Sequence, residues 1–379
     1  MPFACIYVPN FPVAAALRAE PELQARAVAI VEGKPPLEKI VAVEEKATRL
    51  GIAPGMTKAQ AELCSELALR PRSPLQEAAA HAALLDCAQS FSPCVEDAAS
   101  DTALLDLAGM QSLLGALQEI SRAISNRATT LGLAANIAVA SNPDAAAVAA
   151  RGLCGTGALA RVGVTVIPAG KEAERLGPLP VEVLFANPLA EDDQKKAAHR
   201  LLETLDRWGI RNLQALAALP ELALSERLGQ EGLRLQQLAR GAALRTLVPV
   251  EAPLIFEEAA EMEHPIVLLE PLAFLLNRLL EQLCARLGSR ALATQELRLT
   301  LELENFSPFH QQSKINHPFL RTLRLPQPML DAKVFLKLLQ LDLNAHPPGA
   351  PIVKIHLAAE PARPRSAQGG LFLPPSPEP

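Results

Sequence analysis

The sequence has few aromatic residues and lacks the patterns of a metal-bound or disulfide-bonded scaffold. Of its 379 residues only 3% are aromatic, with one Tyr and one Trp, so Leu, Ala and Val must build its interior. The six cysteines form no C-x-x-C pair, and no histidines stand beside them at ligand spacing. Structural zinc and a disulfide framework are therefore not expected, and neither a metal nor a cofactor is predicted.

Long apolar runs and a basic excess are missing as well. No uninterrupted apolar run approaches the ~18 residues of a membrane span, and the start lacks the pattern of a secretory signal, which predicts a cytoplasmic protein. The net charge is −5, so any contact with nucleic acid must come from local patches or backbone groups. With 49% apolar residues, the chain is long enough for two to four domains.

The pattern of strands and helices changes along the chain. Residues 1–165 alternate strands with helices around one hairpin, which predicts an α+β fold. Residues 110–132 are predicted as one long amphipathic helix, and another helix is expected to start with Asn142 at the N-cap and Pro143 at its first position. Between residues 166 and 243, short helices with tight turns replace the strands.

The remainder of the chain has three parts. Residues 244–252 are Pro-punctuated and predict an extended linker. Residues 253–360 predict a compact β-α-β-β-α-β unit, whose clearest element is a strand of period two at residues 292–306. Residues 361–379 are rich in Pro, Gly and Ser without periodicity, which predicts a disordered tail.

Residues 201–220 resemble a helix-hairpin-helix motif. Two apolar-periodic helices are joined by a five-residue turn, Trp208, Gly209, Ile210, Arg211 and Asn212. In such a motif Gly lets the backbone turn, so that N–H groups at the start of the second helix face a DNA phosphate, and Ile210 fills the gap between the helices. The alternative is a plain helical hairpin without a role in binding.

Taken in order, these parts resemble the Y-family translesion DNA polymerases from residue 3 to about residue 360. The stretches "VAVEEKATRLGIAPGMTKAQA", "SDTALLDLAG" and "IAVASNPDAAAVAA" are similar to the family's fingers segment, second catalytic motif and palm helix. The resemblance implies a palm in residues 1–165 with fingers at about 13–75, a thumb with the hairpin motif in residues 166–243, and a little finger in residues 253–360.

The family's metal-binding acids are largely replaced in this sequence. Phosphoryl transfer of this kind uses two Mg²⁺ ions held by carboxylates. At the matching places the first strand has Tyr7 and Pro9, and the family's Asp-Glu pair reads Asp101-Thr102. A phenol with a pKa of about 10 is a poor Mg²⁺ ligand, and proline offers none. The resemblance thus leaves Asp101 as a residual acid, with no catalytic residues.

Nucleotide-binding positions have changed in the same direction. The Tyr and Arg that grip the triphosphate in the family match Glu45 and Thr48, and its palm-helix lysines match Pro143 and Ala147. The aromatic residue that screens the sugar falls at Pro12. A carboxylate at position 45 repels phosphate, by about 1 kcal/mol for two unit charges ~4 Å apart even in water.

A Y-family-like sequence that has lost most metal-binding and nucleotide-binding residues is similar to the degenerate ImuB-type branch of the family. The resemblance implies a non-catalytic adaptor in SOS-type, DNA-damage-induced mutagenesis, with a RecA-like ImuA partner, an error-prone replicative-type polymerase and the sliding clamp as partners. One alternative is an active translesion polymerase whose metal site is rebuilt from Asp101 with Glu96, Asp97 or Asp106. Another is a helix-hairpin-helix DNA-repair scaffold, which would lack a polymerase-like palm in its first 165 residues.

Contact with primer-template DNA is predicted chiefly from the last sheet. Between residues 286 and 357 nine Lys or Arg stand against five Asp or Glu. Alternation places Arg298 and Thr300 on one strand face, opposite the leucines, with Lys354 and His356 on the matching face of another strand and Arg324 beside them. The alternative is a solvated face whose charges only maintain solubility.

The tail carries one apolar cluster. Gln368-Gly369-Gly370-Leu371-Phe372 resembles the bacterial clamp-binding pattern Gln-Leu-Ser/Asp-Leu-Phe, in which Gln hydrogen-bonds while Leu and Phe fill an apolar cleft. The two glycines depart from that pattern and should weaken binding. Gln368, Leu371 and Phe372 are therefore the predicted clamp-binding residues.

Overall fold

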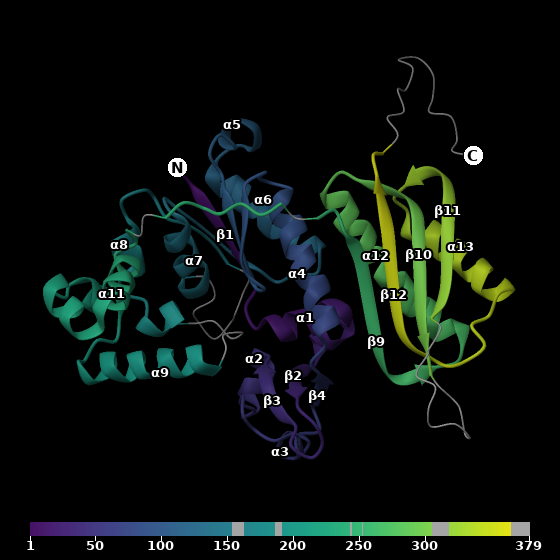
Figure 1. The fold of residues 1–379 in the computed structure, drawn as a ribbon, viewed down its shortest axis with the longest axis horizontal. Helices are drawn as coiled ribbons and strands as arrows, with labels where there is room; N and C mark the ends of the chain where they lie inside the picture. Colours follow the sequence, from purple (N-terminus) through teal and green to yellow (C-terminus); the bar gives the residue numbers. More distant parts are fainter. Residues whose placement is uncertain (154–162, 186–191, 243–244, 252, 305–317, 365–379) are drawn as a thin grey trace. The chain divides into compact units, whose positions relative to one another are not determined.

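The computed structural model describes residues 1–153, 163–185, 192–242, 245–251, 253–304 and 318–364 (Figure 1). The chain forms two compact units, residues 1–252 and 253–379. Each unit has its own sheet structure and its own apolar core.

The main sheet of the first unit has the strand order β5-β6-β1-β7-β8. β8 runs parallel to β7, and the other neighbouring strands are antiparallel. β1 lies between two partners and is almost wholly apolar, as expected for a central strand covered on both faces. The strands are β1 (Phe3–Tyr7), β5 (Val95–Ala99), β6 (Thr102–Asp106), β7 (Asn136–Ala140) and β8 (Val164–Val166). The short β8 was not predicted from the sequence.

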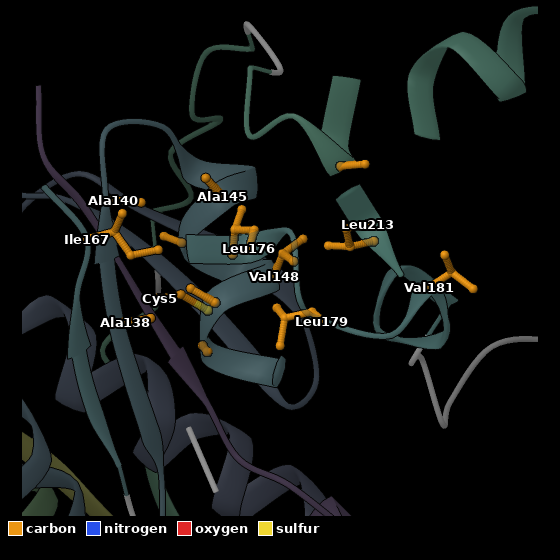
Figure 2. Packing of buried hydrophobic residues seen from close by; sticks show 14 of the residues in the cluster. Cys5, Ala138, Ala140, Ala145, Val148, Ile167, Leu176, Leu179, Val181 and Leu213 are labelled. Atoms are coloured by element: carbon orange, nitrogen blue, oxygen red, sulfur yellow. The ribbon is translucent and has the colours of Figure 1, made fainter. Parts of the chain in front are cut away.

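Helix α7 packs on one face of this sheet. Figure 2 shows Ala145 and Val148 of the helix beside Cys5 and Ala138 of the strands. Asn142 caps the helix as predicted, because its side chain accepts a hydrogen bond from the backbone of Ala145 at 2.8 Å. The helices of this region are α1 (Phe11–Ala19), α4 (Pro74–Gln89), α5 (Gln111–Leu114), α6 (Leu117–Thr130) and α7 (Pro143–Gly152).

The prediction of one long helix over residues 110–132 was wrong. Gly115 has φ 92°, a conformation that ends α5, and α6 then starts at Leu117. The Glu119 carboxylate accepts the Ala116 N–H at 2.8 Å and so satisfies a donor at the start of the new helix. Gly115 followed by Glu119 is the local signal of this break.

Residues 21–71 contain a smaller sheet with the order β3-β2-β4. Its inward-facing residues, among them Val31, Ile40 and Val43, form a separate small core with Ala47 of α2. The elements are η1 (Pro21–Ala25), β2 (Ala27–Glu32), β3 (Lys39–Val43), α2 (Glu45–Arg49), α3 (Lys58–Ala61) and β4 (Leu67–Pro71).

Helices replace strands after β8, as predicted from residue 166 onward, although α9 and α11 are longer than the short helices that the sequence predicted. These helices join the core that contains α7 through Leu176 and Leu213 (Figure 2), and Leu205 and Leu235 belong to the same core. Gly229, with φ 62° and ψ −150°, interrupts α11. The elements are α8 (Glu172–Leu176), η2 (Val181–Phe185), α9 (Asp192–Arg207), α10 (Leu213–Ala217) and α11 (Glu221–Ala239).

The second unit confirms the predicted β-α-β-β-α-β order. Its antiparallel sheet has the order β11-β10-β12-β9, and leucines of β10 and β12 face the leucines of α12. The elements are β9 (Phe256–Ile266), α12 (Leu269–Ser289), β10 (Ala293–Leu303), β11 (Phe319–Met329), α13 (Ala332–Ala345) and β12 (Ile352–Ala362). β12 runs two residues past the boundary at residue 360 that the sequence had predicted.

Candidate functional site

The end of β1 brings the matched metal-site positions together. Tyr7 and Thr102 are direct cross-strand partners, so their side chains share one face of the sheet. Asp101 immediately precedes β6, and its carbonyl accepts the Val8 N–H at 2.9 Å. Tyr7, Asp101 and Thr102 are thus neighbours, and Pro9 lies in the turn that follows β1.

Asp101 and Thr102 are joined to a residue that the sequence analysis did not select. The Thr102 hydroxyl donates to Asp101 Oδ1 at 2.7 Å and accepts from Arg151 Nη2 at 3.4 Å. The Arg151 guanidinium carbon also lies 5.7 Å from the centre of the Tyr7 ring. We call Tyr7, Asp101, Thr102 and Arg151 the palm cluster.

A sequence signal for Arg151 did exist. It is the one basic residue of α7, in which Ala is the most frequent residue type. Arg151 follows the buried Val148 by three residues and therefore lies on the helix face that packs against the sheet. A charged residue in that position must find partners on the strands, and those partners become visible only when the helix is placed.

The electrostatics of the palm cluster favour a neutral phenol. Burial raises the pKa of Tyr7, the negative charge of Asp101 raises it further, and the charge of Arg151 opposes them without reversing the shift. Asp101 is 2% exposed and Thr102 is fully buried. The cluster therefore offers one carboxylate, two neutral hydroxyls and a fixed cation.

These residues do not fit a two-Mg²⁺ centre. Mg²⁺ requires several oxygen ligands, preferably anionic, and two ions require bridging carboxylates. The palm cluster has a single acid, and a guanidinium lies beside it. Among the residues that the structure describes, no group of three or more His, Cys, Asp and Glu side chains is arranged to hold a metal ion.

The acids considered for a rebuilt metal site have other partners. Glu96 accepts from Arg245 at 2.7 Å and from the Val248 N–H at 2.8 Å. Asp97 lies 3.0 Å from His81 Nε2. Asp106 accepts the Ala108 N–H and pairs with Phe3, at the end of β1 opposite to Tyr7. None of the three converges on Asp101.

The positions matched to nucleotide binding offer no basic group. Glu45 forms an ion pair with Arg49 at 2.5 Å. The Thr48 hydroxyl donates to the backbone carbonyl of Glu44 at 3.2 Å. Pro143 and Ala147 lie on α7, and Pro12 lies in the first turn of α1. These contacts are ordinary local ones for short helices and indicate no phosphate-binding pocket.

The predicted hairpin motif has the expected turn. Gly209 has φ 74°, Ile210 is 5% exposed in the core, and Asn212 caps α10 by accepting from Ala215. The indole of Trp208 stacks with Arg227, whose guanidinium carbon is 5.3 Å from the ring centre.

The backbone donors at the start of α10, however, are used within the protein. The N–H of Leu213 donates to Leu179 and that of Gln214 to Gly177, both at 2.9 Å. These contacts favour the alternative of a plain helical hairpin, because the expected phosphate donors are occupied. Arg211 is the basic side chain of the turn, and it lies 3.6 Å from Asp206.

The predicted basic side chains of the second unit contact carboxylates. Arg298 and Arg324 both reach Glu296, at 2.8 and 3.0 Å. Lys354 lies 3.6 Å from Glu302 and 3.7 Å from Glu261. We define the sheet face by these residues and those that pair with them: Glu257, Glu261, Glu296, Arg298, Glu302, Arg324, Lys354, His356 and Glu360.

The sheet face is therefore not basic, contrary to what the count over residues 286–357 suggested. Glu257 and Glu261 come from β9, outside the counted range. Two arginines within that range pair elsewhere, Arg286 with the buried Glu258 and Arg321 with Asp342. The face has more carboxylates than basic groups, while its contact with DNA stays a prediction.

The predicted clamp-binding residues Gln368, Leu371 and Phe372 lie outside the described residues. Within the described part of the chain, no helix combines the length and apolarity needed to cross a membrane.

Comparison with known proteins shows similarity to one family over part of the chain. Residues 6–151 match the family model of the impB/mucB/samB family, a stretch that includes the whole palm cluster. Among curated proteins, the chain is 27% identical to DNA polymerase IV of Dehalococcoides mccartyi, over 82% of this chain and 78% of that protein. It is 29% identical to Protein ImuB of Caulobacter vibrioides, over 74% of this chain and 58% of that protein.

Solved structures show the same architecture over nearly the whole chain. DinB from Sulfolobus solfataricus matches with a TM-score of 0.52 at 14% identity, over 96% of this chain and all of that one. A chimera of Y-family DNA polymerases also matches with a TM-score of 0.52. The chain thus has the mixed α+β fold of the Y-family polymerases, as predicted. Within it, residues 6–151 are similar to the impB/mucB/samB family model.

Proposed function

We propose that this chain is a non-catalytic adaptor of DNA-damage-induced mutagenesis, built on a Y-family polymerase fold. The palm cluster is the observation that carries the proposal. Where the fold calls for metal-binding acids, the chain has a neutral phenol, a buried hydroxyl and a single carboxylate under the influence of Arg151. The similarity to Protein ImuB supports the same reading.

The adaptor would work in the cytoplasm by holding DNA and other proteins together. DNA contact would be weak, independent of sequence and sensitive to salt, through Arg211 of the hairpin and the basic groups of the sheet face. The partners would be the sliding clamp, an error-prone replicative-type polymerase and a RecA-like ImuA protein. Tethering two weak contacts on one chain raises the effective affinity of both.

An active translesion polymerase is the second candidate, and the similarity to DNA polymerase IV favours it. It requires a metal site, and the partners of Glu96, Asp97 and Asp106 argue against one assembled around Asp101. A helix-hairpin-helix repair scaffold is disfavoured. That alternative required the first 165 residues to lack a polymerase-like palm, whereas the chain has the Y-family fold.

Clamp capture tests the adaptor function. Purified sliding clamp is titrated by calorimetry against the full chain and against a Leu371→Ala, Phe372→Ala variant, with Ser376→Ala as the control in the same tail. Each buried apolar side chain contributes about 1.5 to 3 kcal/mol, so the double variant should bind at least about tenfold more weakly. Equal binding by all three proteins would show that the tail does not recruit the clamp.

A further inference from the structure

The palm cluster raises the question of what balances the charge of Asp101. A carboxylate that is 2% exposed is unfavourable unless hydrogen bonds or a positive charge compensate it. In a metal-dependent palm a divalent cation does this. Here the Thr102 hydroxyl donates to the carboxylate and in turn accepts from Arg151. The three groups form a relay that runs from guanidinium to hydroxyl to carboxylate.

The position of Arg151 adds to this argument. Its guanidinium is also close to the face of the Tyr7 ring, where an aromatic quadrupole attracts a cation. Its Nε is buried and has no hydrogen-bond partner among the described residues. Arginine side chains in proteins are always charged, so a guanidinium supplies a permanent cation.

We propose that Arg151 takes the electrostatic place of a divalent metal ion in this palm and keeps such ions out. The inference deepens the proposed function, because it names the residue that maintains the metal-free state. A guanidinium at this place affects metal binding in a way that the loss of the acids alone does not. Restoring carboxylates at Tyr7 and Thr102 would create ion pairs with Arg151, so a metal ion would have to compete with the guanidinium for them.

Metal affinity in acid-restored chains tests the inference. Mn²⁺ is titrated by calorimetry into the full chain carrying Tyr7→Asp and Thr102→Glu, then into the same chain with Arg151→Gln added. Glutamine keeps much of the side-chain length and removes the charge. A third chain carries Arg122→Gln instead, which removes an exposed positive charge of α6 in the same unit.

The chain with Arg151→Gln should bind Mn²⁺ at least tenfold more tightly than the double variant, and the chain with Arg122→Gln should match the double variant. Equal Mn²⁺ affinity with and without Arg151 would overturn the inference. Because the readout is metal binding, that failure would leave the adaptor function standing. Nucleotide incorporation by the unaltered chain would instead refute the adaptor function directly.

A second measurement applies if the acid-restored chains do not fold by circular dichroism. Unfolding by urea is followed for Asp101→Asn, Arg151→Gln and the combination of both in the otherwise unaltered chain. If the guanidinium balances the carboxylate, the combined variant should lose clearly less stability than the sum of the two single losses. Additive losses would show that the two charges do not interact and would overturn the inference.

Discussion

The palm cluster and the sheet face both place basic side chains beside carboxylates, in opposite settings. In the palm cluster one guanidinium serves one buried carboxylate through a buried hydroxyl. On the sheet face three basic side chains pair with four glutamates, a fifth glutamate lies beside His356, and water can reach all of these carboxylates. In the palm cluster each group has fixed partners inside the protein. On the sheet face the carboxylates outnumber the basic side chains, and water can replace either partner.

Because one set of charged groups is exposed and the other is buried, the two regions affect different properties of the protein. Exposed ion pairs contribute about 0 to 1 kcal/mol and are screened by salt, so DNA affinity at the sheet face can change with single surface charges. Buried charges depend on their partners, because removing one leaves the other uncompensated. On the proposal above, the metal-free state of the palm depends on buried partners, so one substitution should not reverse it.

The largest contrast between buried and exposed pairs is expected within the second unit. Arg286 and Glu258 lie 3.3 Å apart with 2% and 1% of their side chains exposed. Arg286→Met should lower the free energy of unfolding by about 3 to 5 kcal/mol, because it deprives a buried carboxylate of this counter-charge. Arg298→Met on the sheet face should change it little, because water screens an exposed ion pair. Urea unfolding of both variants checks this, and similar losses would break the comparison.

A smaller effect is expected from the hydroxyl of the palm cluster. Thr102→Val keeps the shape and removes the donor to Asp101, which should lower the unfolding free energy by about 1 to 3 kcal/mol. Thr300→Val, the same change on β10 beside the sheet face, should alter it by less than about 0.5 kcal/mol. Thermal unfolding compares the two, and a harmless Thr102→Val would mean that Asp101 does not need this hydrogen bond.

DNA affinity should respond to the charges of the sheet face. Reversing Arg298 and Arg324 to Glu should weaken binding of labelled primer-template DNA by about tenfold at low salt, equally for unrelated sequences. Glu296→Gln should strengthen it, because that carboxylate holds both arginines. Fluorescence anisotropy measures both effects, with Arg122→Glu, Arg175→Glu as the charge-matched control. Unchanged affinity in the first variant would assign the sheet face to solubility.

The smallest expected effect is a pH dependence from the one tyrosine of the chain. The folded protein raises the pKa of Tyr7 above 10.0, chiefly by burial. Its stabilising contribution is therefore complete below pH 10 and is lost as the pH rises through the folded pKa, since the unfolded chain releases the proton first. Absorbance at about 295 nm follows this titration directly, because Tyr7 is the only tyrosine. A midpoint below 10 would contradict the burial of the phenol.

Local patterns predicted much of the fold. The alternating leucines of β10 and the Asn142-Pro143 start of α7 are local, so they could be read from the sequence. The break at Gly115 was missed because the apolar spacing continues through it. The neighbours of Tyr7 were found through the resemblance to a family, which supplied the matching positions.

The missed parts of the site depend on contacts between distant segments. Arg151 contacts Thr102 across 49 residues, and the Leu179 carbonyl accepts the N–H of Leu213 although η2 and α9 lie between them in the sequence. The acids of β9 lie beside Lys354 only because β9 pairs with β12. Charge counts along the sequence cannot show which strand faces supply the charges, and this is why the sheet face was predicted to be basic.

Primer extension measures the central claim most directly. The full chain is incubated with primer-template DNA, all four deoxynucleotides and either Mg²⁺ or Mn²⁺, beside a reaction without protein and one with Asp101→Ala. The account predicts no incorporation above the reaction without protein, because the palm cluster holds a guanidinium and a single acid where transfer needs two metal ions. Extension by the unaltered chain that disappears in Asp101→Ala would show that the remaining acid supports catalysis and would contradict the account.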